Sequence, residues 1–186
     1  MKPRSLTTPL RLPDVVQMEV GDLIEITGVI YTGRDAILPQ LVRELDEGRW
    51  GGPDLNGGVI FHTGVSVAGV GPTTSNKKEI ESSIGPLSRL GIRLHIGKGK
   101  LSSSTVQELA HFGSVFAITP PTTALFRDRV TAQRVVAFPN EGMEAMYELT
   151  VVRFPAVVAV ARNGTIWDNS GGWIGRAIPA GSAPGA

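Results

Sequence analysis

The chain has 186 residues, of which 41% are hydrophobic, and this is enough to build the core of one compact domain. Eighteen basic and seventeen acidic residues leave a formal net charge of +1, which argues against a broad nucleic-acid-binding face. The absence of cysteine excludes disulfides, a thiolate nucleophile and any zinc or iron–sulfur site made from this chain's own thiolates. No apolar run approaches membrane-spanning length and no apolar signal core follows Met1, so we expect a cytoplasmic protein without a membrane segment.

The first third of the chain alternates between turn-forming and apolar segments. Residues 1–13 are punctuated by proline and are predicted to form an arm that lies against a neighbouring surface. Apolar residues alternate with polar ones over 22–31, which predicts a strand pair or one long bent strand. Helical spacing over 37–45 predicts a helix. The stretch 50–58, rich in glycine, proline, Asp and Asn, predicts a loop before a short buried strand at 58–61.

Helices and strands are predicted to alternate through the rest of the chain. A helix is expected over 78–90, where an internal Gly-Pro pair favours a break. Residues 92–96 predict a half-buried strand, 102–105 offer a helix N-cap, and 115–118 predict another strand.

In the last third we expect a helix that follows 119–123 and extends to Val130, a strand at 135–138 and a short helix at 143–149. A strictly apolar strand at 156–161 then ends in an Asn-Gly hairpin turn. This alternation indicates an α/β layered domain with a largely buried sheet.

The stretch 70–78 has the composition of an anion-binding loop. Glycines allow the backbone to approach a ligand closely, and the free N–H groups at the start of the predicted helix favour negative charge. Thr73 and Thr74 can donate hydrogen bonds there, and Lys77 adds positive charge. Serine and threonine more often serve only to cap helices, so the argument depends on a second cationic element.

Two other positions supply such cations. Lys98 lies between two glycines at the end of the strand 92–96, where it can reach into a cleft. Arg34 lies in the loop before the helix 37–45, where its guanidinium can bind a carboxylate through two hydrogen bonds, although a surface salt bridge to a nearby acid is the alternative.

Other site types fit the sequence less well. A nucleotide-binding P-loop fails on spacing, because Gly91 and Gly97 enclose five residues where the motif has four, and Lys98 is not followed by Ser or Thr. His62, His95 and His111 lack metal-ligand spacing and are interpreted as ordinary, partly buried histidines.

Seven short segments, in this order, resemble one known family. It is the β subunit, or C-terminal domain, of the iron–sulfur class of fumarate hydratases and L-tartrate dehydratases, and the resemblance runs from about Leu6 to Trp167. The segments are Leu6-Thr7-Thr8-Pro9-Leu10, Val20-Gly21-Asp22, Gly28-Val29-Ile30-Tyr31-Thr32-Gly33-Arg34-Asp35, Gly58-Val59-Ile60-Phe61-His62, Val70-Gly71-Pro72-Thr73-Thr74-Ser75, Ile96-Gly97-Lys98-Gly99 and Phe154-Pro155-Ala156-Val157-Val158.

The resemblance implies a single domain with a swivelling β/β/α fold over 1–169, followed by a flexible Gly, Pro, Ala and Ser tail over 170–186. It implies a non-cluster subunit that binds no cofactor itself. A cysteine-bearing α subunit would hold the iron–sulfur cluster, whose open iron acts as a Lewis acid on the substrate. The implied assembly is a hetero-oligomer, with a β–β dimer left open.

The implied reaction adds or removes water on a four-carbon dicarboxylate, with fumarate and malate first and tartrate next. Thr73 resembles the group that takes the C3 proton, whereas Arg34 and Lys98 resemble the side chains that hold the carboxylates. Thr74 and Lys77 complete the implied substrate-binding set. A threonine hydroxyl is a weak base, so this role needs a strong positive field, which Lys77 and Lys98 could supply.

The chain also departs from the family pattern. Lys77 occupies the place of a usual arginine, and the segment between Phe61 and Val70 is short. These departures favour the alternative function, a non-catalytic dicarboxylate-binding or interaction module derived from the same fold.

Overall fold

The computed structural model describes residues 2–66, 69–71, 77–119 and 128–167, with the backbone alone for 69–71 and 77–80. Most of its strands form one eight-stranded sheet, and β4 and β5 form a separate hairpin. The strands are β1 (Arg4–Thr7), β2 (Leu23–Thr32), β3 (Val59–Phe61), β4 (Gly64–Ser66), β5 (Gly69–Gly71), β6 (Leu94–Gly97), β7 (Val115–Ile118), β8 (Val130–Ala137), β9 (Met146–Ala161) and β10 (Gly164–Thr165). The helices are α1 (Leu12–Val16), α2 (Leu38–Asp46), α3 (Lys77–Arg89), α4 (Ser103–Phe112) and the 3-10 helix η1 (Pro139–Glu144).

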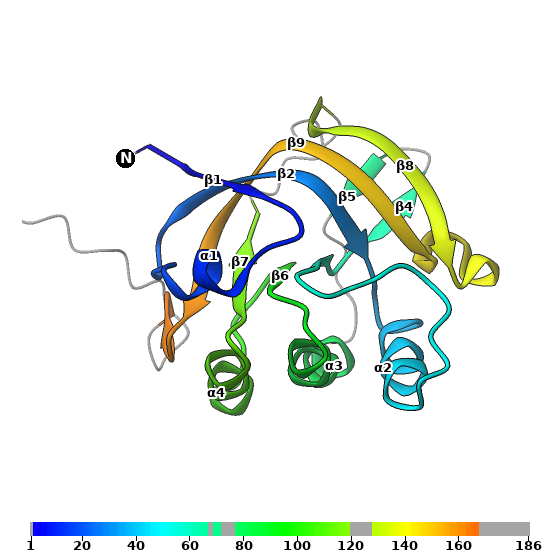
Figure 1. Cartoon of the computed structure of the whole chain (residues 1–186), viewed down its shortest axis with the longest axis horizontal. Helices are drawn as coiled ribbons and strands as arrows, with labels where there is room; N and C mark the ends of the chain where they lie inside the picture. Colours follow the sequence, from blue (N-terminus) through cyan, green and yellow to red (C-terminus); the bar gives the residue numbers. More distant parts are fainter. Residues whose placement is uncertain (1, 67–68, 72–76, 120–127, 168–186) are drawn as a thin grey trace, which may run out of the picture.

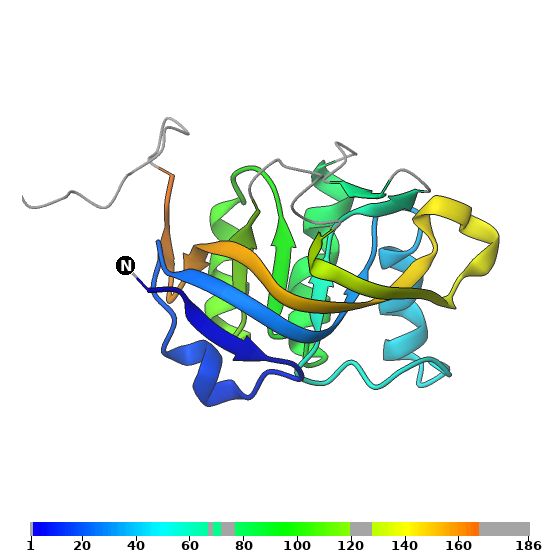
Figure 2. The same cartoon turned by 90° about the horizontal axis from the view of Figure 1, so that it is seen from above.

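The main sheet curls because one long strand joins its two sides. Strands β1, β2, β3, β6 and β7 run parallel to one another, and β9 pairs antiparallel with both β2 and β7. Helices α2, α3 and α4 lie side by side on one side of the sheet, while β2, β9 and β8 arch over the other (Figures 1 and 2). This is a mixed α/β domain with few helices, as the sequence pattern predicts.

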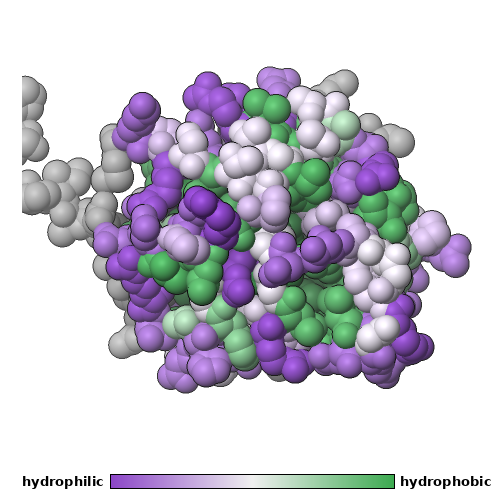
Figure 3. Space-filling model, viewed as in Figure 1, coloured by the Kyte–Doolittle hydropathy of each residue, from purple (hydrophilic) through white to green (hydrophobic). Residues whose placement is uncertain are grey.

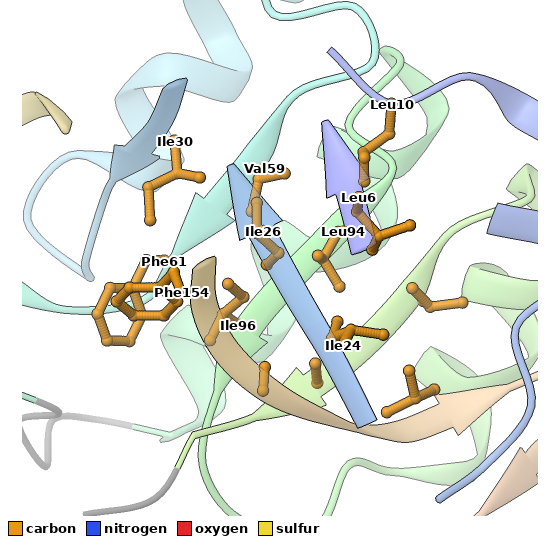
Figure 4. Packing of buried hydrophobic residues seen from close by; sticks show 14 of the residues in the cluster. Leu6, Leu10, Ile24, Ile26, Ile30, Val59, Phe61, Leu94, Ile96 and Phe154 are labelled. Atoms are coloured by element: carbon orange, nitrogen blue, oxygen red, sulfur yellow. The ribbon is translucent and has the colours of Figure 1, made fainter. Parts of the chain in front are cut away.

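Successive side chains of the central strands point to opposite faces of the sheet and contribute to a hydrophobic cluster on each face. Phe61 packs edge-on against Phe154 with ring centroids 5.5 Å apart, in the cluster between the arching strands and the parallel strands (Figure 4). Ile60 points to the other side, where it packs with α2 and α3 residues such as Leu41 and Leu87. Large apolar side chains that stay exposed are dispersed over α1, β2, β8, β9 and η1. The face shown in Figure 3 accordingly alternates apolar and polar patches.

Most predicted elements are present. The segment 22–31 is one long strand with an irregularity between Ile26 and Gly28. The helix expected at 37–45 is α2, and the N-cap expected at 102–105 begins α4. Ser102 caps α4 by accepting a hydrogen bond from the backbone N–H of Thr105. The predicted turn after β9 places Arg162 and Asn163 at positive φ before β10.

Four expectations are wrong. Residues 1–13 are not an arm, because β1 pairs with β2 and α1 follows. Helix α3 does not break, since Pro86 lies inside it. Asp128 and Arg129 are helical as expected, but Val130 already begins strand β8. The expected helix at 143–149 consists of the end of η1 and the start of β9. Residues 124–127 of the helix expected after 119–123 and the tail 170–186 lie outside the described residues.

Candidate functional site

Four parallel strands end at one edge of the sheet. Thr32 of β2 lies opposite Phe61 of β3, and Gly97 of β6 lies opposite Ile118 of β7. Phe61 in turn pairs with Ile96 of β6, so the segments that follow these strands lie next to one another. In α/β sheets, ligands bind outside the carboxyl ends of the strands. This edge is therefore the candidate site.

Arg34 stands where β2 turns into α2. Its backbone carbonyl accepts hydrogen bonds from the N–H groups of Ile37 and Leu38 at 3.1 and 2.8 Å, which ties it to the start of the helix. Gly33 makes the turn possible, because a Cβ there would lie 2.5 Å from Leu38 Cδ2. The turn leaves the Arg34 side chain 15% exposed at the edge.

Two carboxylates hold the Arg34 guanidinium. Nη1 lies 3.1 Å from Glu144 Oε1, and Nε lies 3.6 Å from Asp35 Oδ1. The predicted alternative of a salt bridge to a neighbouring acid is thus partly correct, and Glu144, which no sequence pattern indicated, is the nearer partner. A ligand carboxylate would have to share the guanidinium with these two acids or displace them from it.

The 3-10 helix η1 borders the site on the side of Arg34. A Cβ on Gly64 of β4 would stand 3.1 Å from the carbonyl oxygen of Met143 and 3.7 Å from Arg34 Cδ, so β4 passes between them without a side chain. The buried Thr32 hydroxyl accepts a hydrogen bond from the Tyr147 N–H at 3.0 Å and so anchors the beginning of β9 to the end of β2.

Lys98 follows β6, two strands away from the end of β2. It is exposed, and Gly99 after it adopts a φ of 83°, which favours glycine. Adjacent strands lie about 4.8 Å apart, so the backbones that carry Arg34 and Lys98 are about 10 Å apart. The structure thus brings these two predicted residues to the same edge.

The remaining predicted residues are less completely described. Thr73 and Thr74 lie outside the described residues, and Lys77 opens α3 with only its backbone described. The last turn of α3 leads to Gly91, whose carbonyl accepts from the Gly57 N–H at 2.9 Å, before the start of β3. Because α3 ends at the opposite edge, its N-terminus, with Lys77, lies toward the candidate site.

A buried polar chain that sequence reasoning missed crosses from β3 to α3. His62 Nε2 lies 3.2 Å from His95 Nδ1, and His95 Nε2 lies 3.0 Å from the Ser88 hydroxyl. The two imidazole rings are stacked, with centroids 5.4 Å apart. The expectation of scattered, partly buried histidines is wrong for this pair, since both are almost completely buried.

Burial keeps both rings neutral. It lowers the pKa of His62 to about 3. Burial and the neighbouring His62 lower the pKa of His95 well below its usual 6.5. A charged imidazole here would lose its hydration without gaining an anionic partner among the described residues.

Three buried polar atoms at this edge have no hydrogen-bond partner in the part of the chain that is described. They are Asp35 Oδ1 after β2, His62 Nδ1 just after β3, and Thr119 Oγ1 just after β7. Buried polar groups normally have a hydrogen-bond partner, so these atoms at the strand ends are candidates for contact with a ligand.

The described residues show a pocket away from this edge and neither a metal site nor a membrane-spanning helix. A pocket of about 230 Å³ is lined by residues that include Thr8, Asp54 and Gly58, at the side where β3 begins. The described residues contain no group of three or more His, Cys, Asp or Glu side chains able to hold a metal ion. No helix among them is long and apolar enough to cross a membrane.

Comparisons with known proteins agree with the resemblance in the sequence. Residues 4–169 match the family model described as "Fumarase C-terminus". The chain is 33% identical over 174 residues to "Putative fumarate hydratase class I" of Geobacillus stearothermophilus, with 86% of this chain and 32% of that protein covered. It therefore spans about a third of that relative's length.

Two further relatives match over most of their own length. "L(+)-tartrate dehydratase subunit beta" of Escherichia coli K12 is 33% identical over 175 residues, with 86% of this chain and 83% of the relative covered. "Putative L(+)-tartrate dehydratase subunit beta" of Methanocaldococcus jannaschii is 30% identical over 165 residues, with 81% of this chain and 84% of the relative covered. Because the family model spans most of the chain and these relatives share its length, the chain belongs to the fumarase C-terminal family.

Proposed function

We propose that this chain is the non-cluster β subunit of a two-subunit iron–sulfur hydro-lyase. It would hydrate and dehydrate a four-carbon dicarboxylate, with fumarate and malate as the first candidates and tartrate as the next. The observation that carries the proposal is the placement of Arg34 and Lys98 at the ends of two strands that flank β3. Their backbones, about 10 Å apart, suit side chains that converge on the two ends of a short dicarboxylate.

Each residue has a proposed task. Arg34 and Lys98 bind the carboxylates, and Thr74 and Lys77 complete the binding set. Thr73 takes the C3 proton in dehydration, a role that needs the positive field that Lys77 and Lys98 could supply. The start of α3 supports this field, because the positive end of its helix dipole lies toward the strand ends.

The residues of this chain do not fit an iron–sulfur cluster. There is no cysteine in the sequence, and no metal-binding group among the described residues. We therefore assign the cluster to a cysteine-bearing α subunit, where it supplies Lewis-acid chemistry to the substrate. What this chain contributes is binding, orientation and a proton acceptor. The hetero-oligomer, a β–β dimer within it, the cytoplasmic location, the 1–169 domain boundary and the swivelling β/β/α fold are parts of the same proposal.

The second candidate is a dicarboxylate-binding or interaction module without catalysis. The Arg34–Glu144 ion pair favours it, since an acid of this chain already occupies the cation that a substrate needs. Lys77 favours it as well, because an ammonium binds a carboxylate as a point charge and not as a fork. Lys77→Arg separates the two: a gain in fumarate turnover supports the hydro-lyase, and a loss indicates a pocket adapted to another ligand.

The first test is purification of the chain with its natural partner under anaerobic conditions, with iron and sulfide assayed on the complex. A cysteine-bearing partner with iron and sulfide supports the subunit proposal, whereas a chain that elutes alone without iron supports the module. On the assembled enzyme, Thr73→Val should remove most turnover without affecting assembly. Arg34→Gln and Lys98→Gln should raise KM for the dicarboxylate, while the controls Arg43→Gln and Lys2→Gln, both on exposed side chains, should not.

A further inference from the structure

The buried chain of Ser88, His95 and His62 ends on an atom with nothing to bind. His95 is the one hydrogen-bond partner of the Ser88 hydroxyl among the described residues, and it also contacts His62. His62 Nδ1, at the far end, is buried and has no partner there. Buried polar groups normally have a hydrogen-bond partner, so the end of this chain of three side chains is a position for a ligand atom.

The direction of these hydrogen bonds follows from the hydroxyl. Ser88 carries one proton, and placing it toward His95 Nε2 satisfies it, so that nitrogen is an acceptor. A neutral imidazole then carries its proton on the other nitrogen, and His95 Nδ1 donates to His62 Nε2. By the same rule, His62 carries its proton on Nδ1. The unpartnered atom is therefore a donor.

This donor points toward the candidate site. The two ring nitrogens of an imidazole point in nearly opposite directions, so Nδ1 of His62 points away from His95. His95 pairs with Ile60, two residues before His62, so the direction away from it is toward the carboxyl ends of the strands. The same edge carries Arg34 and Lys98, and a Cβ on Gly97 would stand only 3.7 Å from His62 Cβ.

We propose that His62 binds the acid ligand directly, by donating its Nδ1–H to a carboxylate oxygen held between Arg34 and Lys98. His95 and Ser88 are positioning residues that fix the tautomer. The inference rests on the proposed dicarboxylate site but concerns binding, whether or not turnover follows. It makes His62 a residue that selects for an oxygen acceptor, because a neutral fixed donor offers direction without a third positive charge.

The tautomer is testable in the isolated full-length chain. Long-range ¹H–¹⁵N NMR spectra of ¹⁵N-histidine-labelled protein at pH 7 distinguish Nδ1–H from Nε2–H rings. We expect both His62 and His95 to be neutral Nδ1–H tautomers. A His62 ring protonated on Nε2 would overturn the inference, because its free nitrogen would then be an acceptor that repels a carboxylate.

A matched pair of variants tests the contact itself. His62→Asn keeps an N–H donor close to the position of Nδ1, whereas His62→Leu has a similar shape and no donor; both lose the bond to His95. Calorimetry with succinate, on the chain in the complex with which it purifies, should give a Kd for His62→Leu about 10- to 100-fold higher than for His62→Asn, as expected for a hydrogen bond to a charged group. Equal dissociation constants for the two variants would overturn the inference and leave only a structural role.

The same samples separate this inference from the proposed function. If the wild type turns over fumarate and the two variants bind succinate equally well, the hydro-lyase proposal stands and the His62 contact is refuted. If the two variants differ strongly in succinate affinity but the wild type shows no turnover, the His62 contact stands and the binding module is favoured. Thermal unfolding of both variants shows whether they fold equally well. If their Tm values are equal, a difference in Kd reports the lost hydrogen bond, and the inference requires that difference.

Discussion

Acidification should destabilise the chain through its buried histidines well before the carboxylates titrate. Burial lowers the pKa of His62 to about 3 in the folded chain, whereas the unfolded value is about 6.5. Above pH 6.5 the ring is neutral in both states and has no effect on the pH dependence. As the pH falls below 6.5, only the unfolded chain gains the proton, so the free energy of unfolding falls until about pH 3.

The size of the effect follows from this difference. Between pH 7.5 and 5.0, His62 alone should lower the free energy of unfolding by about 2 kcal/mol. The pKa of His95 is shifted in the same direction by burial and by His62, so it adds a loss of the same sign. Several kilocalories per mole is a large share of the stability of an ordinary domain.

Urea unfolding of the full-length chain at pH 7.5, 6.0 and 5.0, followed by circular dichroism, measures this loss. His62→Leu is the matched variant, because it removes the titrating group and should reduce the loss by about 2 kcal/mol. The reasoning is refuted if the wild type loses no more stability than His62→Leu over this range. It is also refuted if NMR finds either buried ring protonated in the folded chain at pH 5.5.

Three other substitutions test the surroundings of the site. Gly97→Ala places a Cβ 3.1 Å from the buried Phe116 ring, so urea unfolding should show a destabilisation of about 1–3 kcal/mol. Ser88→Ala removes the hydroxyl that donates to His95, leaves a buried acceptor unpaired and should lower stability by about 1–3 kcal/mol, whereas Ser103→Ala, at an exposed position of α4, should have little effect. Glu144→Gln removes the nearer acid from Arg34 and should lower the succinate Kd by up to about fivefold in calorimetry; an unchanged or higher Kd would mean that this acid does not compete with the ligand.

The sequence predicts the edge of the site because strand ends are local features. Arg34 follows an alternating strand and precedes a helix, and Lys98 follows another strand between glycines, so both could be placed at strand ends without knowing the sheet. The structure then brings them to one edge because β2, β3 and β6 are parallel neighbours. The family resemblance, and not periodicity, is what indicated Thr73.

The buried histidine pair could not be predicted in the same way. Alternation shows that His95 lies between two buried apolar residues, but it does not tell which strand pairs with it. The contact with His62 depends on the register between β3 and β6, which brings together residues 33 positions apart. Register of this kind is set by tertiary packing, not by local pattern.

Long-range pairing also explains the elements that were misassigned. Met143, Met146 and Leu149 repeat every three residues, as in a helix, yet Met146 and Leu149 lie in β9. There Leu149 pairs with Ile30 of β2 on one side and with Gln133 of β8 on the other. Two ladders of backbone hydrogen bonds outweigh a weak helical pattern. The N-terminal segment Arg4–Thr7 is likewise a strand only because the neighbouring β2 offers a free edge.

The arrangement of charge at the edge has its own logic. Arg34 and Lys98 are cations on either side of the end of β3, and a third cation between them would repel both when no ligand is bound. The strand end between them carries His62, which desolvation keeps neutral down to a pKa of about 3. Its hydrogen bonds to His95, and through it to Ser88, orient a donor without charge. A site built in this way attracts an anion through its two outer cations and distinguishes between anions through the position of one central N–H, so affinity and specificity depend on different residues.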